Sequence, residues 1–326
     1  MTVDNEAKET SLLAKRRRLT VVVWLMIIAQ AAIGQESNDT DDGLIDPVAH
    51  AGQPVLLRSG FTFTEGPLWV ASQQALLFSD VRESVTWRYQ APDQFDRYIE
   101  ATGGGNGLAI TPNGELIICQ VESRTLGHLL LPVSHDERPP PLQVLADNFD
   151  GTSNGLASGR FNQTNDAIVR SDGTIYFSDP AYRPHQRDLE HTGVYRLTSD
   201  GEVHLVTRDY YPNGIALSPD ERYLYVVNET KVERLELLAD GSTRNPMTLL
   251  ETTSNGDGMA VDDAGNLYVA TKQIEVFAPN GRAFGVIKLP GRGLTNCTFG
   301  GRDRKTLFAT TADSLTAIPM PIPGLP

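Results

Sequence analysis

The sequence is poor in the residues that build soft-metal centres. It contains only two cysteines, Cys119 and Cys297, which excludes a disulfide framework and a cysteine-built metal site. Both lie in apolar, strand-like surroundings, so we expect two buried thiols, with a single bridge as the alternative in an oxidising compartment. The six histidines show no metal-ligand spacing, and the absence of a Gly-x-Ser-x-Gly elbow argues against a serine hydrolase.

Positive charge is also scarce. The chain has 28 Lys and Arg against 41 Asp and Glu, a formal net charge of −13, and no Lys/Arg-rich stripe follows the first eighteen residues. A nucleic-acid-binding surface needs such a stripe to neutralise phosphates. Nucleic acid is therefore excluded as a partner.

No apolar run is long enough for a typical membrane-spanning helix. The longest, 19–33, follows four basic residues (15–18), is interrupted by Gln30 and falls short of the roughly 20 residues required. Small residues precede Gln35, as at a cleavage site. We expect residues 1–34 to be a cleaved signal peptide, which gives a periplasmic or secreted product with no membrane association; an uncleaved N-terminal anchor is the alternative.

A repeated pattern organises the rest of the chain. Each copy has a polar residue, usually followed by Gly, then an apolar stretch, a turn with Asp or Asn near Gly, and a short alternating strand. Successive copies begin 39 to 59 residues apart. The polar lead residues, called the channel ring below, are Glu65, Asn106, Asn165, Asn213, Asp257 and Asn296.

The repeat length and composition predict blades of four short antiparallel strands. The apolar stretches are broken too often by Gly, Pro and Asp to be helices, and the Asn-Gly and Asp-Gly pairs supply the positive φ of tight hairpin turns. Such units cannot bury both faces alone, so six of them should close into an all-β six-bladed β-propeller. We expect a polar tail or closing segment at 35–54 and a single propeller domain at 55–326.

The channel ring predicts a cation site. The innermost strand of each blade lines the axis of a propeller, so these side chains should meet around the channel. They carry only carboxylate and carboxamide oxygens, which suit Ca²⁺ better than zinc or copper. Asn and Asp before Gly are also common turn formers, but turn chemistry does not explain Glu65.

Several motifs together resemble the senescence marker protein (regucalcin)/gluconolactonase family of six-bladed propellers, over roughly residues 55 to 315. Glu65-Gly66-Pro67-Leu68-Trp69 resembles the family's opening motif, and 165–169 with 171–173 and 177–180 resembles its central one. Pro212-Asn213-Gly214, Gly256-Asp257-Gly258-Met259 and 295–301 resemble the later ones. Each motif is weak alone, but their order and spacing are specific.

The resemblance implies a calcium-dependent hydrolase that opens a small sugar lactone. By this resemblance the metal ligands are Glu65, Asn165, Asn213 and Asp257, with a substrate oxygen or water completing the calcium shell. Asp257 would also be catalytic, activating water or attacking directly. Asn106, Asp166, Asn296 and Tyr182 are the expected substrate-binding or orienting residues, although Tyr182 is at least as well explained by packing.

Two departures from the family pattern bear on substrate choice. Gln163 and Thr164 stand where animal members carry Arg and Pro before the central Asn, and Gln120 and Val121 stand where many bacterial gluconolactonases carry an acid and a His. Two other functions stay open. One is a non-catalytic propeller that binds a protein or a small ligand; the other is an esterase or phosphotriesterase acting on an aryl ester or a phosphotriester at the same metal site.

Overall fold

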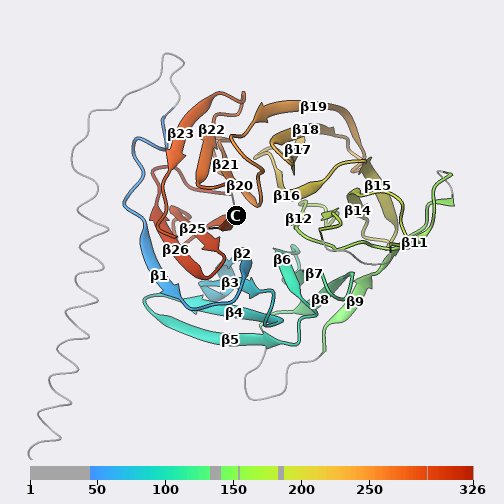
Figure 1. Cartoon of the computed structure of the whole chain (residues 1–326), viewed down its shortest axis with the longest axis horizontal. Coiled ribbons are helices and arrows are strands. Elements are labelled where there is room, and N and C mark those ends of the chain that lie inside the picture. Colours follow the sequence, from blue (N-terminus) through green and yellow to red (C-terminus); the bar gives the residue numbers. More distant parts are fainter. Residues whose placement is uncertain (1–44, 133–140, 153–154, 183–186, 292, 326) are drawn as a thin grey trace, which may run out of the picture.

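Six antiparallel sheets of four strands surround a central axis in the computed structural model, which confirms the predicted β-propeller (Figure 1). The structure describes residues 45–325 except 133–140, 153–154, 183–186 and 292. The predicted signal peptide and residues 35–44 lie outside these residues. No described residue is in an α-helix, and η1 (Ala71–Gln73) is a 3₁₀ turn.

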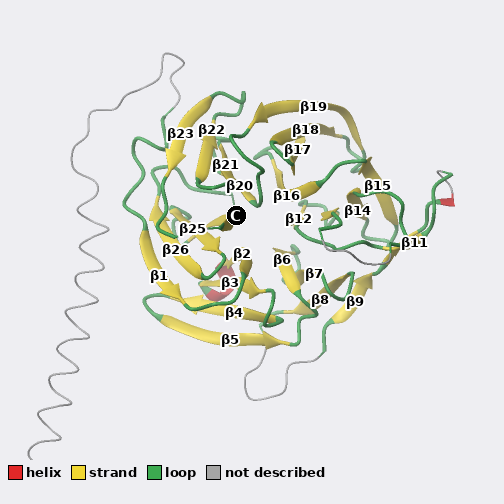
Figure 2. Cartoon of the chain, in the orientation of Figure 1, coloured by secondary structure: helices red, strands yellow, loops and turns green. Residues whose placement is uncertain are grey.

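The blades follow one another in chain order, each running from the channel outward (Figure 2). Blade one contains β2 (Thr64–Val70), β3 (Ala75–Asp80), β4 (Val85–Gln90) and β5 (Gln94–Glu100). Blade two contains β6 (Gly105–Ile110), β7 (Glu115–Gln120), β8 (Thr125–Leu130) and β9 (Gln143–Ala146). Blade three contains β12 (Ala167–Val169), β13 (Ile175–Asp179), β14 (Gly193–Leu197) and β15 (Val203–Arg208). Blade four contains β16 (Pro212–Leu217), β17 (Tyr223–Asn228), β18 (Lys231–Leu237) and β19 (Thr243–Glu251). Blade five contains β20 (Met259–Val261), β21 (Leu267–Ala270), β22 (Ile274–Phe277) and β23 (Ala283–Ile287).

Blade six closes the ring with strands from both ends of the described chain. It contains β24 (Leu294–Gly300), β25 (Thr306–Thr311) and β26 (Ser314–Pro319), and its outermost strand is β1 (Val55–Ser59). β1 pairs antiparallel with β26, with Val55 opposite Ala317. Figure 1 shows β1 in blue alongside the red β26. This pairing joins the first and last segments of the propeller, so the blades form a closed circle.

The hydrophobic core is divided among the six blade interfaces. Each buried cluster draws its residues from two neighbouring blades; for example, Tyr268 of blade five packs edge-on against Phe299 of blade six, with ring centroids 5.0 Å apart. Each such large apolar side chain contributes about 1.5–3 kcal/mol when fully buried. Cys119 and Cys297 belong to two of these clusters as buried free thiols, which confirms the first of the two cysteine predictions.

The longest repeat interval holds a hairpin that the sequence did not predict. β10 (Asn148–Phe149) pairs with β11 (Gly159–Arg160), and Phe149 is buried in the interface between blades two and three.

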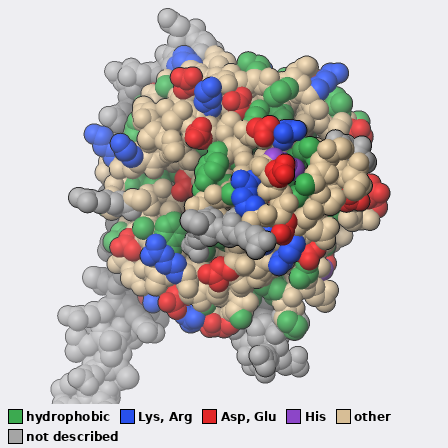
Figure 3. All heavy atoms as spheres, turned by 45° about the vertical axis from the view of Figure 1, so that its right-hand side comes forward, with side chains coloured by type: hydrophobic (Ala, Val, Ile, Leu, Met, Phe, Trp, Pro, Cys, Tyr) green, Lys and Arg blue, Asp and Glu red, His purple; other side chains and the backbone are tan. Residues whose placement is uncertain are grey.

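On the face shown in Figure 3, acidic and basic side chains are interspersed. In the described part of the chain, no helix has the length and apolar character needed to cross a membrane.

Candidate metal and active site

The regular pairing of every inner strand is interrupted at or next to its channel-ring residue. The β-ladder register shifts between Glu65 and Leu68 in blade one, and similar shifts occur at the ring positions of blades two, four and six. In blades three and five, β12 and β20 begin only after Asn165 and Asp257. A bulge re-aims the side chains next to it and bends the strand. The same local device is therefore repeated around the channel.

The glycine after a ring residue allows adjacent inner strands to approach closely. A Cβ on Gly258 would lie 1.9 Å from Cγ of Asn296, and one on Gly107 would lie 2.5 Å from Oδ1 of Asp166. Gly258 N also donates to Thr295 O at 2.7 Å. Any larger residue would push the neighbouring blade's polar side chain out of place.

These contacts correct part of the turn interpretation. Gly114 and Gly173, in hairpin turns, have φ of 85° and 90°, as predicted. Gly107, Gly214 and Gly258 are not among the residues with positive φ, so the glycine in these Asn-Gly and Asp-Gly pairs serves close packing between blades.

A polar residue at the end of the second strand fixes the segment before the ring residue in four blades. Asp179 accepts hydrogen bonds from the backbone N–H groups of Asn162 (2.8 Å) and Gln163 (2.7 Å). Asp80 accepts in the same way from the N–H groups of Thr62 (2.9 Å) and Phe63 (3.0 Å), ahead of Glu65.

In the other two of these four blades, the residue at the end of the second strand has an amide side chain. Gln120 Nε2 donates to Thr102 O at 2.8 Å, and Asn228 Oδ1 accepts from Tyr211 N at 3.0 Å. We call these four the clamp residues: Asp80, Gln120, Asp179 and Asn228. They were not among the predicted site residues, although the repeated Phe-Ser-Asp ending of β3 and β13 was a signal for two of them.

Glu65 is buried among other acids and amides of the channel. Its side chain accepts a hydrogen bond from Gly66 N (3.1 Å), and Asn296 Nδ2 donates to the same oxygen at 3.4 Å. Burial raises the pKa of the Glu65 carboxyl well above its ordinary value, and the negative charges of Asp257 and Asp166 add to the rise. The structure thus brings residues of blades one, three, five and six into electrostatic contact.

Asp257 and Asp166 experience the same environment. Burial raises the pKa of each carboxyl to about 7. At Asp257, a hydrogen bond from Asn213 lowers the pKa, whereas the negative charge of Asp166 raises it further. Asp166 accepts from the N–H groups of Ala167 (3.0 Å) and Ile215 (3.3 Å), so it also ties blade three to blade four.

Asn165 and Asn106 are buried next to this group. Asn165 O accepts from Gly107 N at 2.8 Å, and Asn106 O accepts from Ser79 Oγ at 2.7 Å.

The donor set fits a hard divalent cation. Among the residues that the structure describes, no Lys or Arg lowers the raised pKa of the Asp166 or Asp257 carboxyl, so no cation from this part of the chain balances these two acids. Within the described ranges, no group of three or more His, Cys, Asp or Glu side chains is arranged to hold a metal ion. A cation in the channel would thus take carboxylate oxygens together with Asn amide oxygens, which are ligands that Ca²⁺ accepts.

Tyr182 stands at the edge of the acid group. Its hydroxyl donates to Pro212 O at 3.1 Å, next to Asn213 in the chain. Burial raises the pKa of this hydroxyl well above its ordinary value, and the charges of Asp257 and Glu65 raise it further. The hydroxyl end is therefore held beside the Asn213 segment, while the residue as a whole is 40% exposed.

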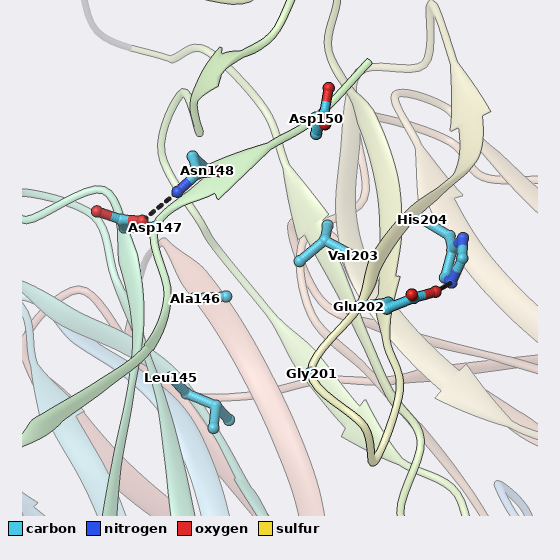
Figure 4. A pocket seen from close by; sticks show the side chains of 9 residues that line it. All are labelled: Leu145, Ala146, Asp147, Asn148, Asp150, Gly201, Glu202, Val203 and His204. Atoms are coloured by element: carbon cyan, nitrogen blue, oxygen red, sulfur yellow. Dashed lines mark hydrogen bonds and ion pairs between the residues drawn. The ribbon is translucent and has the colours of Figure 1, made fainter. Parts of the chain in front are cut away.

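A separate surface cavity of about 470 Å³ lies away from the channel, between β9–β10 and the turn into β15 (Figure 4). Asn148 Nδ2 donates to Asp147 Oδ1 at 2.6 Å there, and Glu202 lies 3.4 Å from His204. The lining is acidic but the acids are exposed and already paired in part. We place the candidate site in the channel, where the acids are buried and come from separate blades.

The fold and this site define a class: a six-bladed propeller with a ring of acidic and amide side chains in its channel. The chain belongs to the SMP-30/Gluconolactonase/LRE-like region family, whose profile matches residues 63–313. The resemblance predicted from the motifs is therefore confirmed.

Individual relatives agree with this assignment. A gluconolactonase of Zymomonas mobilis is 28% identical over 310 residues, covering 84% of this chain and 83% of the relative, and regucalcin of Gallus gallus is 24% identical over 262 residues, covering 76% and 82%. The solved structure of a gluconolactonase from Xanthomonas campestris superposes with a TM-score of 0.76 at 27% identity, covering 88% of this chain and 96% of that one.

Proposed function

We propose that this protein is a calcium-dependent lactonase that opens a small sugar lactone in its channel. The observation that carries the proposal is the set of buried carboxyls and amides that separate blades direct to the channel: the charges of Asp166 and Asp257 raise the pKa of Glu65, and Asn296 donates to the Glu65 carboxylate. Similarity to proteins named gluconolactonase and lactonase supports lactone hydrolysis.

Four side chains would hold the ion: Glu65, Asn165, Asn213 and Asp257. A bound calcium ion would supply Lewis-acid polarisation of the lactone carbonyl and would stabilise negative charge on its oxygen. Other groups of the chain hold the carboxylates in place. Asn296 donates a hydrogen bond to Glu65, and the backbone N–H groups of Ala167 and Ile215 donate to Asp166.

Asp257 carries out the proton transfer. Its ionised carboxylate accepts a proton from water as the water oxygen bonds to the carbonyl carbon. The ring C–O bond then breaks, and the proton passes from Asp257 to the departing alkoxide, which gives the hydroxy acid. Direct attack by Asp257 would instead form an anhydride that water hydrolyses, with the same products. Asn106 and Tyr182 are the residues proposed to contact the substrate.

The test is hydrolysis of a lactone panel by protein stripped with a chelator, with Ca²⁺, Mg²⁺, Mn²⁺ or Zn²⁺ added back. We expect activity to be lost on chelation, restored most fully by Ca²⁺, and reduced at least 100-fold in Asp257→Asn, in the range typical for loss of a general base. Full activity in the chelated sample or in Asp257→Asn would overturn the proposal.

The same panel separates the rival functions. Hydrolysis of a phosphotriester or an aryl ester without hydrolysis of any lactone would replace the proposed substrate class. Calcium binding without hydrolysis of any compound in the panel would favour a propeller that binds a protein or a small ligand.

A further inference from the structure

Two tyrosines hold each other's loops beside the channel. Tyr182 lies between β13 and β14 of blade three, and Tyr211 lies just before β16 of blade four. Tyr182 Oη donates to Pro212 O at 3.1 Å, and Tyr211 Oη donates to Ala181 O at 3.0 Å. The rings meet edge to face, with centroids 5.2 Å apart and planes at 73°. Each hydroxyl therefore anchors its ring to the other tyrosine's loop.

This arrangement leaves aromatic surface available. Both side chains are 40% exposed even though both hydroxyls are engaged with backbone carbonyls. The solvent-exposed part of each residue is therefore aromatic carbon. Its hydroxyl bond and the contact between the two rings hold each ring in place.

The pair is also close to the candidate site. Pro212, the acceptor for Tyr182, directly precedes Asn213, and Tyr211 is two residues from it. The bond from Tyr182 Oη to Pro212 O puts the hydroxyl end beside the Asn213 segment, and the charges of Asp257 and Glu65 raise the pKa of that hydroxyl. The rings therefore extend from the edge of the polar site toward solvent.

We propose that Tyr182 and Tyr211 form an aromatic wall of the substrate pocket that packs against the C–H face of a sugar ring. A sugar lactone has hydroxyl groups around its edge and C–H bonds on its ring faces, so it suits a pocket with amides on one part and aromatic carbon on another. This inference rests on the proposed function, and it assigns to Tyr211 a role in substrate affinity.

The test uses gluconolactam, a sugar lactam that resists hydrolysis, as the binding probe in calorimetry with calcium-loaded protein. Tyr211→Leu removes the ring, whereas Tyr211→Phe keeps it and removes only the hydroxyl. Tyr223→Leu, at the start of β17, is the matched control away from the pair. An aromatic contact of about 0.5–1.5 kcal/mol corresponds to a roughly 2- to 12-fold weaker Kd in Tyr211→Leu. Tyr211→Phe should stay within about twofold of the parent, and Tyr223→Leu should be unchanged.

Three results would overturn the proposed aromatic wall. Equal affinity in Tyr211→Leu and the parent would remove its role in binding, and equal losses in Phe and Leu would assign the effect to the Tyr211 Oη bond to Ala181. No binding of the lactam by the parent protein would also contradict it, even if lactones are hydrolysed. The expected binding pattern in a protein that hydrolyses no lactone would retain the wall and reject the proposed function.

Discussion

The Asp179 carboxylate accepts a 2.7 Å hydrogen bond from the backbone N–H of Gln163, two residues before Asn165. A second bond, from Asn162 N, fixes the same turn of chain. Asp80 holds the segment before Glu65 in the same way. The position of two proposed ligands therefore depends on carboxylates that would not touch the ion.

We expect Asp179→Asn to weaken calcium binding about 10- to 100-fold, the usual effect of losing an outer partner of a metal ligand. The substituted amide lacks one of the two acceptor oxygens, so the segment before Asn165 is less firmly held. Calcium titration calorimetry measures the change.

Asp262→Asn is the matched control. Asp262 is a buried carboxylate that also accepts backbone N–H bonds, from Ala264 (3.0 Å) and Asn266 (2.9 Å), but it lies beyond the other end of β20. We expect Asp179→Asn and Asp262→Asn both to lower the melting temperature, but Asp262→Asn should leave the calcium affinity unchanged. If both variants lose the same affinity, the effect is general destabilisation and the positioning role of Asp179 is wrong.

The stability of chelated protein should fall as pH rises from 5 to 8. Asp166 and Asp257 have pKa values raised to about 7 by burial, whereas in the unfolded chain they titrate near 4. Between these values the folded protein binds more protons than the unfolded chain, so the free energy of unfolding decreases with pH. Thermal melts of the chelated protein should show a decrease of at least a few degrees.

Added calcium should raise the melting temperature most at pH 8, where the carboxyls are ionised. Asp257→Asn should flatten the pH dependence of the chelated protein. A residual slope remains from Glu65 and Asp166, and from Asp179, whose pKa burial also raises to about 7. A melting temperature that is constant or increases between pH 5 and 8 would show that burial does not raise the pKa values of the channel acids.

Gly258→Ala should disrupt the site through packing. The new Cβ would lie 1.9 Å from Asn296 Cγ, and displacement of that amide breaks its hydrogen bond to Glu65. We expect at least a tenfold loss of lactone hydrolysis or of calcium affinity. Gly114→Ala has open space around it but a φ of 85°, so it should lower stability by about 1 kcal/mol and leave activity intact. Unchanged activity in Gly258→Ala would refute the packing role.

The fold could be predicted because one pattern recurs six times. The short strand expected after the turn of each repeat is present, for example as β7 and β17. Hairpin turns with Asp or Asn next to Gly mark the strand ends directly in the sequence. The β10–β11 hairpin carries no such repeat signal, because it occurs in one blade only.

The site could be predicted in part for a different reason. Ring membership follows from repeat position, so residues such as Glu65 and Asp257 could be placed in one channel before any coordinates. The hydrogen bonds of the clamp residues and the contact of Tyr182 with Tyr211 depend on how loops between different strands pack together. The spacing of residues in the sequence does not predict this packing. The ladder breaks at the ring residues were likewise unpredicted, since Asn-Gly reads as a hairpin turn.

The N-terminal segment gives a prediction that is independent of the site. We expect export of the protein with cleavage before Gln35, because basic residues precede an apolar run that ends in small residues. Mass spectrometry of the periplasmic or secreted product, expressed from the full sequence, measures the new N-terminus. A membrane-bound product that retains residues 1–34 would establish the uncleaved anchor instead.

Calorimetric titration of chelated protein with CaCl₂, in parallel for the parent chain and Asp257→Asn, tests most directly whether oxygens from separate blades share one cation. We expect the parent to saturate at about one equivalent of calcium, and the variant to bind at least 100-fold more weakly because a charged ligand is lost. Absence of calcium binding in the parent, or equal affinity in the two proteins, would contradict the account.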